Sequence, residues 1–353
     1  MEFSVFFIGP TLGQGSEREV CDAILREAQL AEQLWFDAAW FAEHHFDATF
    51  STLPSPNLML AAVAAATSRI KIGCAINVLP FHNPLRIAEE GAMLDVLSHG
   101  RFQWGIGRGI TGHELRSFQV ESRHTRSLFN ETHDAVIQAW TTGRMEHQGD
   151  LVRVPPTTIA PSVVQRPHPP VWVTAQSPAS VEWAAERDYP AMQIGEPLSV
   201  GRAQLQRYRD AAEKAGVRTR RGGIVPLRMV YVAETDAQAR EEAAARTLAF
   251  WDHTARTTAP NYKDPGPAKE QEGYEYWLRN NPGRLESLSF DSLCEQGLVI
   301  AGSPATVITG IQRQIEALEC THLMCDFWRP SGIAKREAAM RLFAAEVMPA
   351  FRT

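Results

Sequence analysis

Three short stretches of the sequence place polar side chains where chemistry could be done, and the first is Glu43-His44-His45-Phe46. Histidine is the side chain best suited to proton transfer near neutral pH, so either imidazole is a candidate acid or base. The run follows an apolar segment, Ala38 to Ala42, that is typical of a β-strand, and adjacent strand residues point to opposite faces. The two histidines therefore cannot easily share a metal ion. We predict proton transfer here and no metal site; a structural role is the alternative for either histidine alone.

The second stretch is Gly105-Ile106-Gly107-Arg108-Gly109. It begins like the G-x-G-x-x-G dinucleotide motif, but Ile110 stands where the third glycine belongs, and Gly112 interrupts the helix that the motif requires. Closely spaced glycines instead let a large flat molecule approach the backbone, and Arg108 among them suits a phosphate group. Packing alone is the alternative explanation for the glycines.

The third stretch is Ala175-Gln176-Ser177-Pro178-Ala179-Ser180. Ser177 has the features of a helix N-cap with proline at the first helical position, although such a pair can also be an ordinary helix start. Free N–H groups and the positive end of a helix bind phosphate readily, and Ser180 adds a hydroxyl one turn on. With Arg108 on a neighbouring strand, this describes a pocket for one phosphate monoester. Without a P-loop or an acidic Mg²⁺ cluster, we expect a cofactor's phosphate and no phosphoryl transfer.

These motifs need a scaffold, and the hydrophobic pattern supplies one. Continuous apolar segments alternate with amphipathic helical segments, which predicts an α/β protein with a parallel sheet covered on both faces. Eight such units predict closure into a single (β/α)8 TIM barrel, residues 1–353 forming one domain; an open doubly wound sheet is the alternative. Reactive residues of a barrel lie at the carboxyl ends of its strands, where all three motifs fall. The strand segments are Phe3–Ile8, Ala38–Ala42, Ile70–Val78, Phe102–Ile106, Val171–Ala175, Ala191–Ile194, Ile224–Val232 and Thr321–Phe327.

Two stretches interrupt the alternation. Glu146 to Pro170 is rich in proline and suggests a small hairpin around Gly149-Asp150. Trp251 to Leu298 is long and carries four prolines and Asn280-Asn281. A loop of this length in a compact domain is usually functional or disordered, so we predict a mobile flap over the site at 251–298, with surface decoration as the alternative.

Composition excludes several classes of protein. The 353 residues carry a formal net charge of −6, which argues against a nucleic-acid-binding surface. The five cysteines are odd in number and form no C-x-x-C, which is typical of reduced thiols in the cytosol. The longest apolar run, Leu58 to Ala66, is far shorter than the roughly 20 residues that span a bilayer. We therefore expect a cytoplasmic protein with neither a membrane nor a nucleic acid as partner.

Taken together, the motifs resemble the bacterial-luciferase-like flavin-dependent monooxygenases. The resemblance runs in order from the first strand to about Gly195 and resumes weakly at Thr321 to Phe327. Four ordered motifs make it specific. They are Ala42-Glu43-His44-His45-Phe46; Gly73 to Pro80 with Asn83-Pro84-Leu85-Arg86; Gly100-Arg101-Phe102 with Gly105 to Gly109; and Ala175-Gln176-Ser177 with Trp183-Ala184-Ala185.

The resemblance implies a two-component enzyme. A partner flavin reductase would use NAD(P)H to supply reduced FMN, dioxygen would form a flavin C4a-hydroperoxide, and this would oxidise a small organic substrate. A homodimer, or a heterodimer with a related subunit, is also implied, through the helices after strands two and three. The sequence does not select the substrate among sulfonates, ketones, aldehydes, chelators and natural-product intermediates, nor among hydroxylation, Baeyer–Villiger and C–S or C–N cleavage chemistry.

By the same resemblance, His44 is the catalytic acid/base and Arg108, Gln176, Ser177 and Ser180 bind the phosphate. Cys74 and Ala75 are implied to be joined by a cis non-proline peptide behind the flavin ring. Glu43 and Asn77 are further cofactor-binding candidates, and Phe6, His45 and Gly107 are expected to line the substrate space.

Two departures from the family pattern count against light emission from a long-chain aldehyde. Gly107 stands at the position of the luciferase reactive cysteine, which predicts more room at the flavin edge. Gly195 stands where luciferases carry an aromatic residue near the flavin.

Two other functions fit the same scaffold. A related barrel could use a deazaflavin for hydride transfer without oxygen. A barrel could also bind flavin without turnover, as a store or as a dimer partner. The Glu43 to Phe46 run favours FMN over deazaflavin, and the presence of both His44 and Arg108 favours an enzyme over a flavin-binding barrel.

Overall fold

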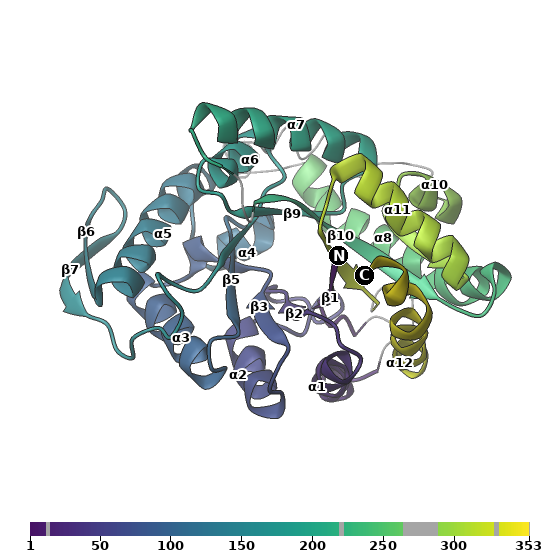
Figure 1. Cartoon of the computed structure of the whole chain (residues 1–353). Helices are drawn as coiled ribbons and strands as arrows, with labels where there is room; N and C mark the ends of the chain where they lie inside the picture. Colours follow the sequence, from purple (N-terminus) through teal and green to yellow (C-terminus); the bar gives the residue numbers. More distant parts are fainter. Residues whose placement is uncertain (12–14, 219–221, 264–288, 328–331, 353) are drawn as a thin grey trace.

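Eight parallel strands close into a ring, seen in Figure 1 with the helices outside it. The computed structural model describes residues 1–11, 15–218, 222–263, 289–327 and 332–352, and of 253–263 only the helical backbone. Because β10 pairs with both β9 and β12, the sheet has no opening, which confirms the barrel and excludes the open sheet. In ring order the strands are β1 (Glu2–Phe7), β2 (Ala38–Phe41), β3 (Lys71–Cys74), β5 (Phe102–Gly107), β8 (Val171–Thr174), β9 (Pro190–Ile194), β10 (Gly223–Val232) and β12 (His322–Asp326).

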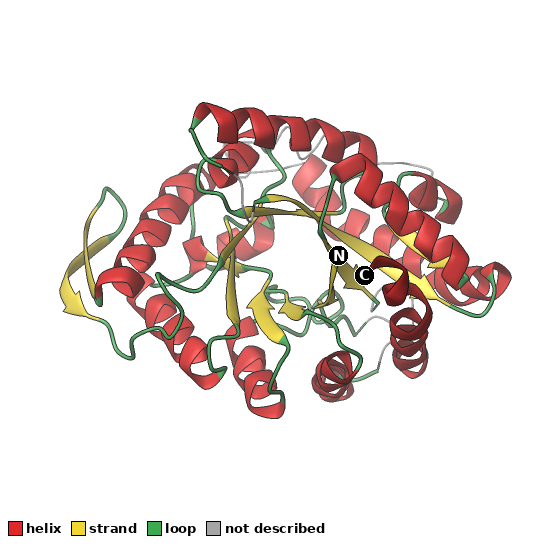
Figure 2. Cartoon of the chain, viewed as in Figure 1, coloured by secondary structure: helices red, strands yellow, loops and turns green. Residues whose placement is uncertain are grey.

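All eight predicted strand segments are confirmed, and helices lie between them along the chain. Figure 2 shows the helices in red around the yellow ring of strands. The helices are α1 (Glu17–Gln33), α2 (Pro56–Ala66), α3 (Pro84–Leu97), α4 (Gly112–Ser117), α5 (Thr125–Thr142), α6 (Pro178–Ala185), α7 (Leu198–Lys214), α8 (Asp236–Lys263), α10 (Phe290–Glu295), α11 (Pro304–Leu318) and α12 (Ile333–Leu342). Short 3₁₀ turns occur at Leu79–Phe81, Ser122–His124 and Met348–Phe351, and a π-helical turn at Phe343–Val347.

Local sequence explains where the helices begin and end. Ser16 and Glu19 form a capping box at the start of α1. Asn83 accepts hydrogen bonds from the first N–H groups of α3, ahead of Pro84. Gly143 ends α5 in a left-handed conformation that costs glycine little. The starts and stops that frame the barrel are therefore encoded locally.

The interior of the barrel is filled by large side chains that neighbouring glycines accommodate. Trp40 is fully buried and its ring lies 4.9 Å from that of Trp172, nearly edge to face. A Cβ on Gly73 would lie 2.3 Å from the Trp40 ring, so only glycine leaves room for the indole. Phe6, predicted to line the substrate space, belongs to this packed interior and is 2% exposed. The barrel thus has a solid floor beneath its rim.

Four strands of the described residues lie outside the ring. β6 (Arg144–Gln148) and β7 (Arg153–Thr158) form the predicted antiparallel hairpin. The two-residue strand β4 (Asn77–Val78) pairs with β5 beyond the end of β3. A further strand, β11 (Val299–Gly302), pairs with the carboxyl half of β10 and was not predicted.

The expectation of a flap at 251–298 needs correction at its ends. Its first residues, to Lys263, continue helix α8, and its last form α10 and the approach to β11. Residues 264–288 lie outside the described part of the chain, so a mobile flap remains a prediction for that segment alone. Among the described residues, no helix is long and apolar enough to cross a membrane.

Candidate active site

The three chemical motifs and the segment after β3 lie on one continuous arc of the barrel rim. Because the strands are parallel, their carboxyl ends meet at one edge, and β2, β3, β5 and β8 are consecutive neighbours in the ring. The three chemical motifs follow β2, β5 and β8, and the Cys74–Val78 segment follows β3 between them. The fold therefore brings these motifs to one side of the rim, as the sequence predicted.

His44 is held by a buried carboxylate that the sequence analysis did not single out. Its Nδ1 lies 3.2 Å from Oε1 of Glu114, a residue of α4 that is 2% exposed. The same oxygen accepts a hydrogen bond from the backbone N–H of His45 at 2.8 Å. The His44 side chain keeps 28% of its surface exposed, so it is both oriented and accessible.

Glu43 is the centre of a second buried network. Its carboxylate accepts hydrogen bonds from His45 Nε2 at 3.2 Å and His82 Nε2 at 2.9 Å. The amide of Asn77 and the backbone N–H of Val78 also donate to it. Burial alone would raise the pKa of Glu43, but the bonds from His45 and His82 outweigh it and lower that pKa to about 2. Glu43 is therefore an anion, and the pKa of His82 is raised by the same contact, against the effect of burial.

Asn77 and Cys74 are engaged within the protein as well. Asn77 donates to both Glu43 and Asn57, and its oxygen accepts from the Cys74 thiol at 3.1 Å. The thiol also lies 3.2 Å from the Gly105 carbonyl, and burial raises the pKa of Cys74 to about 12. With Glu43, these side chains are buried. We expect them to support the site, and direct contact with a cofactor stays a prediction.

The cis peptide bond lies one residue later than predicted. It joins Ala75 to Ile76, not Cys74 to Ala75. The Ala75 N–H still bonds the Phe41 carbonyl at 2.7 Å, so the Cys74–Ala75 peptide continues the ladder with β2.

Gly107 does not open the space that the sequence suggested. A Cβ at this position would lie 2.0 Å from Cδ1 of Ile76. The side chain that follows the cis bond therefore fills the volume a larger residue would take. The prediction of extra room at Gly107 is wrong for this reason, whereas its place on the rim at the end of β5 is as expected.

The serine motif forms a compact group of donors. Ser177 caps α6 by accepting from the Ser180 N–H, and the two hydroxyl oxygens lie 2.9 Å apart. Arg126, near the start of α5, donates from Nη2 to the Ser180 hydroxyl at 3.3 Å. Both serines are more than nine-tenths buried. A guanidinium, two hydroxyls and a helix N-terminus thus converge at one point, which is the donor set that fits a phosphate.

Gln176 and Arg108 flank this group differently. The Gln176 side chain donates to the Ile194 carbonyl at 2.7 Å and so ties the end of β8 to β9. Arg108 follows β5, whose Ile106 pairs with Val173 of β8, so its backbone lies beside the approach to Gln176. Phosphate binding by either side chain stays a prediction.

Two aromatic side chains of α8, Phe250 and Trp251, lie near rim residues of the barrel. The Phe50 ring lies 4.7 Å from the His44 imidazole and stacks on Phe250 at 5.8 Å. Trp251 follows, and a Cβ on Gly195 would lie 3.4 Å from its ring. The Trp251 indole of α8 therefore lies beside Gly195, the position at which luciferases carry an aromatic residue.

Three site residues escaped the sequence analysis. Glu114 lies on a six-residue helix inside a glycine-rich stretch, where no amphipathic pattern could form. Arg126 lies in the first turn of α5, outside the three motifs, and no local pattern marks it. His82 ends the mostly apolar segment that follows β3, and its position there was the one available signal.

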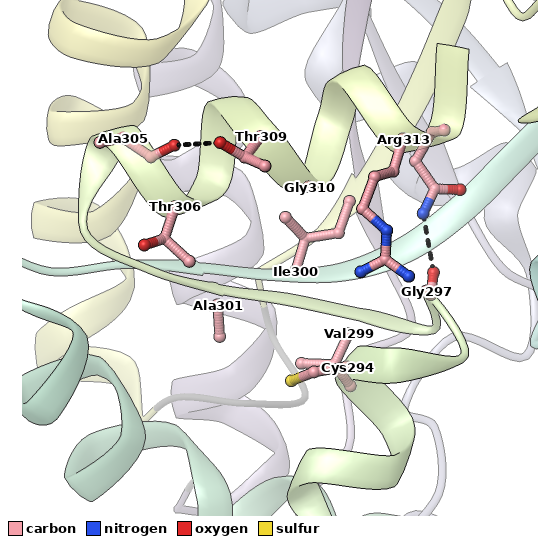
Figure 3. Close-up of a pocket in the computed structure, with 11 residues that line it drawn as sticks. Cys294, Gly297, Val299, Ile300, Ala301, Ala305, Thr306, Thr309, Gly310 and Arg313 are labelled. Carbon is pink, nitrogen blue, oxygen red and sulfur yellow. Dashed lines mark hydrogen bonds between the residues drawn. The ribbon is translucent and has the colours of Figure 1, made fainter. Parts of the chain in front are cut away.

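Other features of the structure lie apart from this arc. Among the described residues there is no group of three or more His, Cys, Asp or Glu side chains that could hold a metal ion. A pocket of about 330 Å³ lies between α10, α11 and β11, the strand that pairs with β10 outside the ring. Figure 3 shows the residues that line it. It contains no residue that the sequence analysis selected.

Comparison with known proteins gives a family. A family model described as luciferase-like monooxygenase matches residues 1–321. The alkanal monooxygenase alpha chain of the Kryptophanaron alfredi symbiont is 26% identical, covering 99% of this chain and 98% of that one. The oxygenase component of the flavin-dependent trigonelline monooxygenase of Acinetobacter baylyi is 28% identical, covering 99% and 96%.

Solved structures share the fold over the full length. Monooxygenase RslO1 from Streptomyces bottropensis superposes with a TM-score of 0.81 at 27% identity, each chain being covered completely. The coenzyme F420-dependent tetrahydromethanopterin reductase of Methanopyrus kandleri has a TM-score of 0.73 at 19% identity, with 99% of each chain covered. At that identity the second likeness shows the fold alone.

Proposed function

The chain belongs to the luciferase-like monooxygenase family of flavin-dependent enzymes, and from that premise we propose that it is the oxygenase component of a two-component system. Reduced FMN from a partner reductase would bind at the rim, and a small organic molecule would be oxidised with dioxygen. The observation that carries this proposal is one arc of rim holding both an oriented, accessible imidazole at His44 and a phosphate-type donor set at Ser177, Ser180 and Arg126.

The donor set would hold the phosphate end of the flavin. Arg126 supplies positive charge, and Ser177 and Ser180 supply hydroxyls at the amino end of α6. Arg108 follows the neighbouring strand and would add a second guanidinium. A single phosphate held here would let the ring system extend along the rim toward β3 and β2.

When bound, reduced flavin supplies the two electrons with which dioxygen is activated at flavin C4a. This chain's own residues do the rest: His44 would hold or accept a proton, while the aromatic rings of Phe50, Phe250 and Trp251 exclude water from that part of the mouth. An apolar surround limits the loss of reactive oxygen species to solvent.

A partner reductase is proposed because the trigonelline relative is named as an oxygenase component. A dimer is proposed on separate grounds. Leu58 of α2 and Met93 and Leu97 of α3 are 75%, 54% and 45% exposed, on the helices where the family resemblance implies a subunit contact. An apolar face of this kind is typical of an interface. Sedimentation at several protein concentrations, with Met93→Glu as the disrupting variant, tests it.

The decisive experiment supplies FMN, NADH and a generic flavin reductase to the protein with a panel of small ketones, sulfonates, aldehydes and heteroaromatic acids. We expect substrate-dependent oxygen uptake and incorporation of isotopically labelled oxygen into one product class. Oxygen-independent hydride transfer from reduced deazaflavin would contradict the proposal. Tight FMN binding with no turnover across the panel would favour a flavin-binding barrel.

A further inference from the structure

We propose that Glu114 is the positioning residue for His44: it fixes which ring nitrogen carries the hydrogen and leaves Nε2 as the atom that accepts a proton. The proposal rests on the function proposed above. Its basis is geometric, because one carboxylate oxygen of Glu114 lies 3.2 Å from His44 Nδ1 and 2.8 Å from the His45 backbone nitrogen. A single atom thus joins two consecutive residues of the rim.

The charge state of Glu114 decides the tautomer. Burial would raise the pKa of this carboxyl, but the hydrogen bonds from His44 and from the His45 N–H lower it below its usual range. An ionised carboxylate can only accept hydrogen bonds, so Nδ1 of His44 must be the donor. The neutral ring then has its lone pair on Nε2. A proton gained there would make a cation whose charge Glu114 compensates.

The ring is also fixed in orientation. Phe50 packs against the imidazole with centroids 4.7 Å apart and planes at 74°. The His44 backbone N–H bonds the Leu53 carbonyl at 3.1 Å. The imidazole is therefore held through its backbone, its Nδ1 edge and an aromatic contact, which is the preorganisation that proton transfer needs.

The neighbouring histidine shows why His44 takes this role. His45 Nε2 is bound to Glu43, and its side chain is only 10% exposed. The other titratable groups around the pair are His113, which contacts the His45 carbonyl, and His82, which shares Glu43. Of the two adjacent imidazoles, only His44 combines a carboxylate at Nδ1 with an accessible side chain.

Nitrogen NMR of the full chain labelled in histidine tests the tautomer directly. The His44 signal is identified by its loss in His44→Gln. We expect Nδ1 protonated and Nε2 unprotonated at neutral pH. In Glu114→Leu no side-chain acceptor faces Nδ1, so we expect the ring to lose its preference for the Nδ1–H form. A wild-type ring with Nδ1 unprotonated, or the same tautomer preference in Glu114→Leu, would overturn the proposal.

Turnover provides the second readout. We expect Glu114→Gln to lower kcat roughly 10–100-fold with the dissociation constant of reduced FMN unchanged, and Glu114→Asp to recover part of the loss. The matched control is Glu121→Gln, which removes an exposed acid bound to Arg123 and should leave kcat as it was. Full kcat in a folded Glu114→Gln enzyme would contradict the role.

The two readouts separate this proposal from the function it rests on. The NMR measurement needs neither flavin nor substrate, so a tautomer switch in a protein without oxygenase activity would overturn the proposed function and leave the geometric role of Glu114 in place. Oxygenase activity with no tautomer switch would support the proposed function and overturn the role of Glu114.

Discussion

The two sides of the rim are built on different principles. On the histidine side, at the ends of β2 and β3, buried carboxylates bind the polar groups: Glu43 accepts four hydrogen bonds and Glu114 accepts two. On the serine side, at the end of β8, a guanidinium and two hydroxyls contact one another, from Arg126 to Ser180 to Ser177. The first side is built around carboxylate acceptors, whereas the second gathers donors of the kind that fit an anion.

The difference indicates a division of labour. A proton carrier works best when its geometry is fixed before the ligand arrives, so its supporting charges are supplied by the chain. An anchor for a phosphate must leave its donors to the ligand. Variants on the histidine side should therefore affect turnover and stability, whereas variants on the serine side should affect affinity for the flavin.

The largest effect is expected for His44→Ala. General acid–base catalysis contributes about 10²–10⁴-fold, so kcat should fall by at least two orders of magnitude. The dissociation constant of reduced FMN should stay within about twofold, because the phosphate anchor is untouched. Stopped-flow turnover and flavin titration measure the two quantities. His147→Ala, on the hairpin outside the ring, is the control. Unchanged turnover in His44→Ala would end the proton-transfer role.

Glu43→Gln should destabilise the fold by roughly 3 kcal/mol near pH 5–6. The pKa of Glu43 falls from 4.5 to about 2 on folding, so its stabilisation is present above pH 4.5 and is lost as the pH drops toward 2. The pKa of His82 is raised from 6.5, so its contribution is present below pH 6.5 and is lost as the pH rises through the folded value. The difference from wild type should therefore be largest between these limits.

Urea unfolding at several pH values measures this difference. Glu319→Gln, an exposed acid paired with Arg209, is the matched control and should change stability little at any pH. A loss in Glu43→Gln that does not vary with pH would show that packing, and not the charge, holds the histidine side together.

The sequence predicted most of the scaffold because its signals are local. The eight strands are continuous apolar runs, and their helices begin at caps such as Asn83 and Ser177. β11 was missed because it lies just past a long segment with no apolar alternation, and α8 extends further than its pattern suggested because helix propensity alone does not mark its end.

The site was predicted less completely, since its partners meet only after folding. Glu114 lies 70 residues from His44 in sequence, and Arg126 lies 54 from Ser180. No local pattern connects such pairs. The cis bond was predicted one residue too early for a related reason. The Ala75 N–H donates to the Phe41 carbonyl of β2, and this contact forms only in the folded barrel.

On the serine side, Arg126→Ala should weaken reduced-FMN binding about 10–100-fold, because a hydrogen bond to a charged group is worth roughly 1.5–3 kcal/mol. Reduced riboflavin, which lacks the phosphate, should bind wild type and variant equally. Fluorescence titration at two salt concentrations measures both. Arg123→Ala, which removes an exposed cation three residues earlier, is the control. If Arg108→Ala weakens FMN binding and Arg126→Ala does not, the phosphate is bound by the residue that follows β5 and not by Arg126.

The smallest effect is expected between the two sides, at the end of β5. Gly107→Ala would place a Cβ 2.0 Å from the end of the Ile76 side chain, which can turn away, so we expect about 1 kcal/mol of destabilisation. Ile76→Val should relieve much of it in the double variant, a coupling that a double-mutant cycle in urea measures. Gly105→Ala is the contrast, because its Cβ would meet the rigid Cys74 carbonyl at 1.9 Å and should cost far more. Strict additivity of the Gly107 and Ile76 changes would show that the two residues do not share this volume.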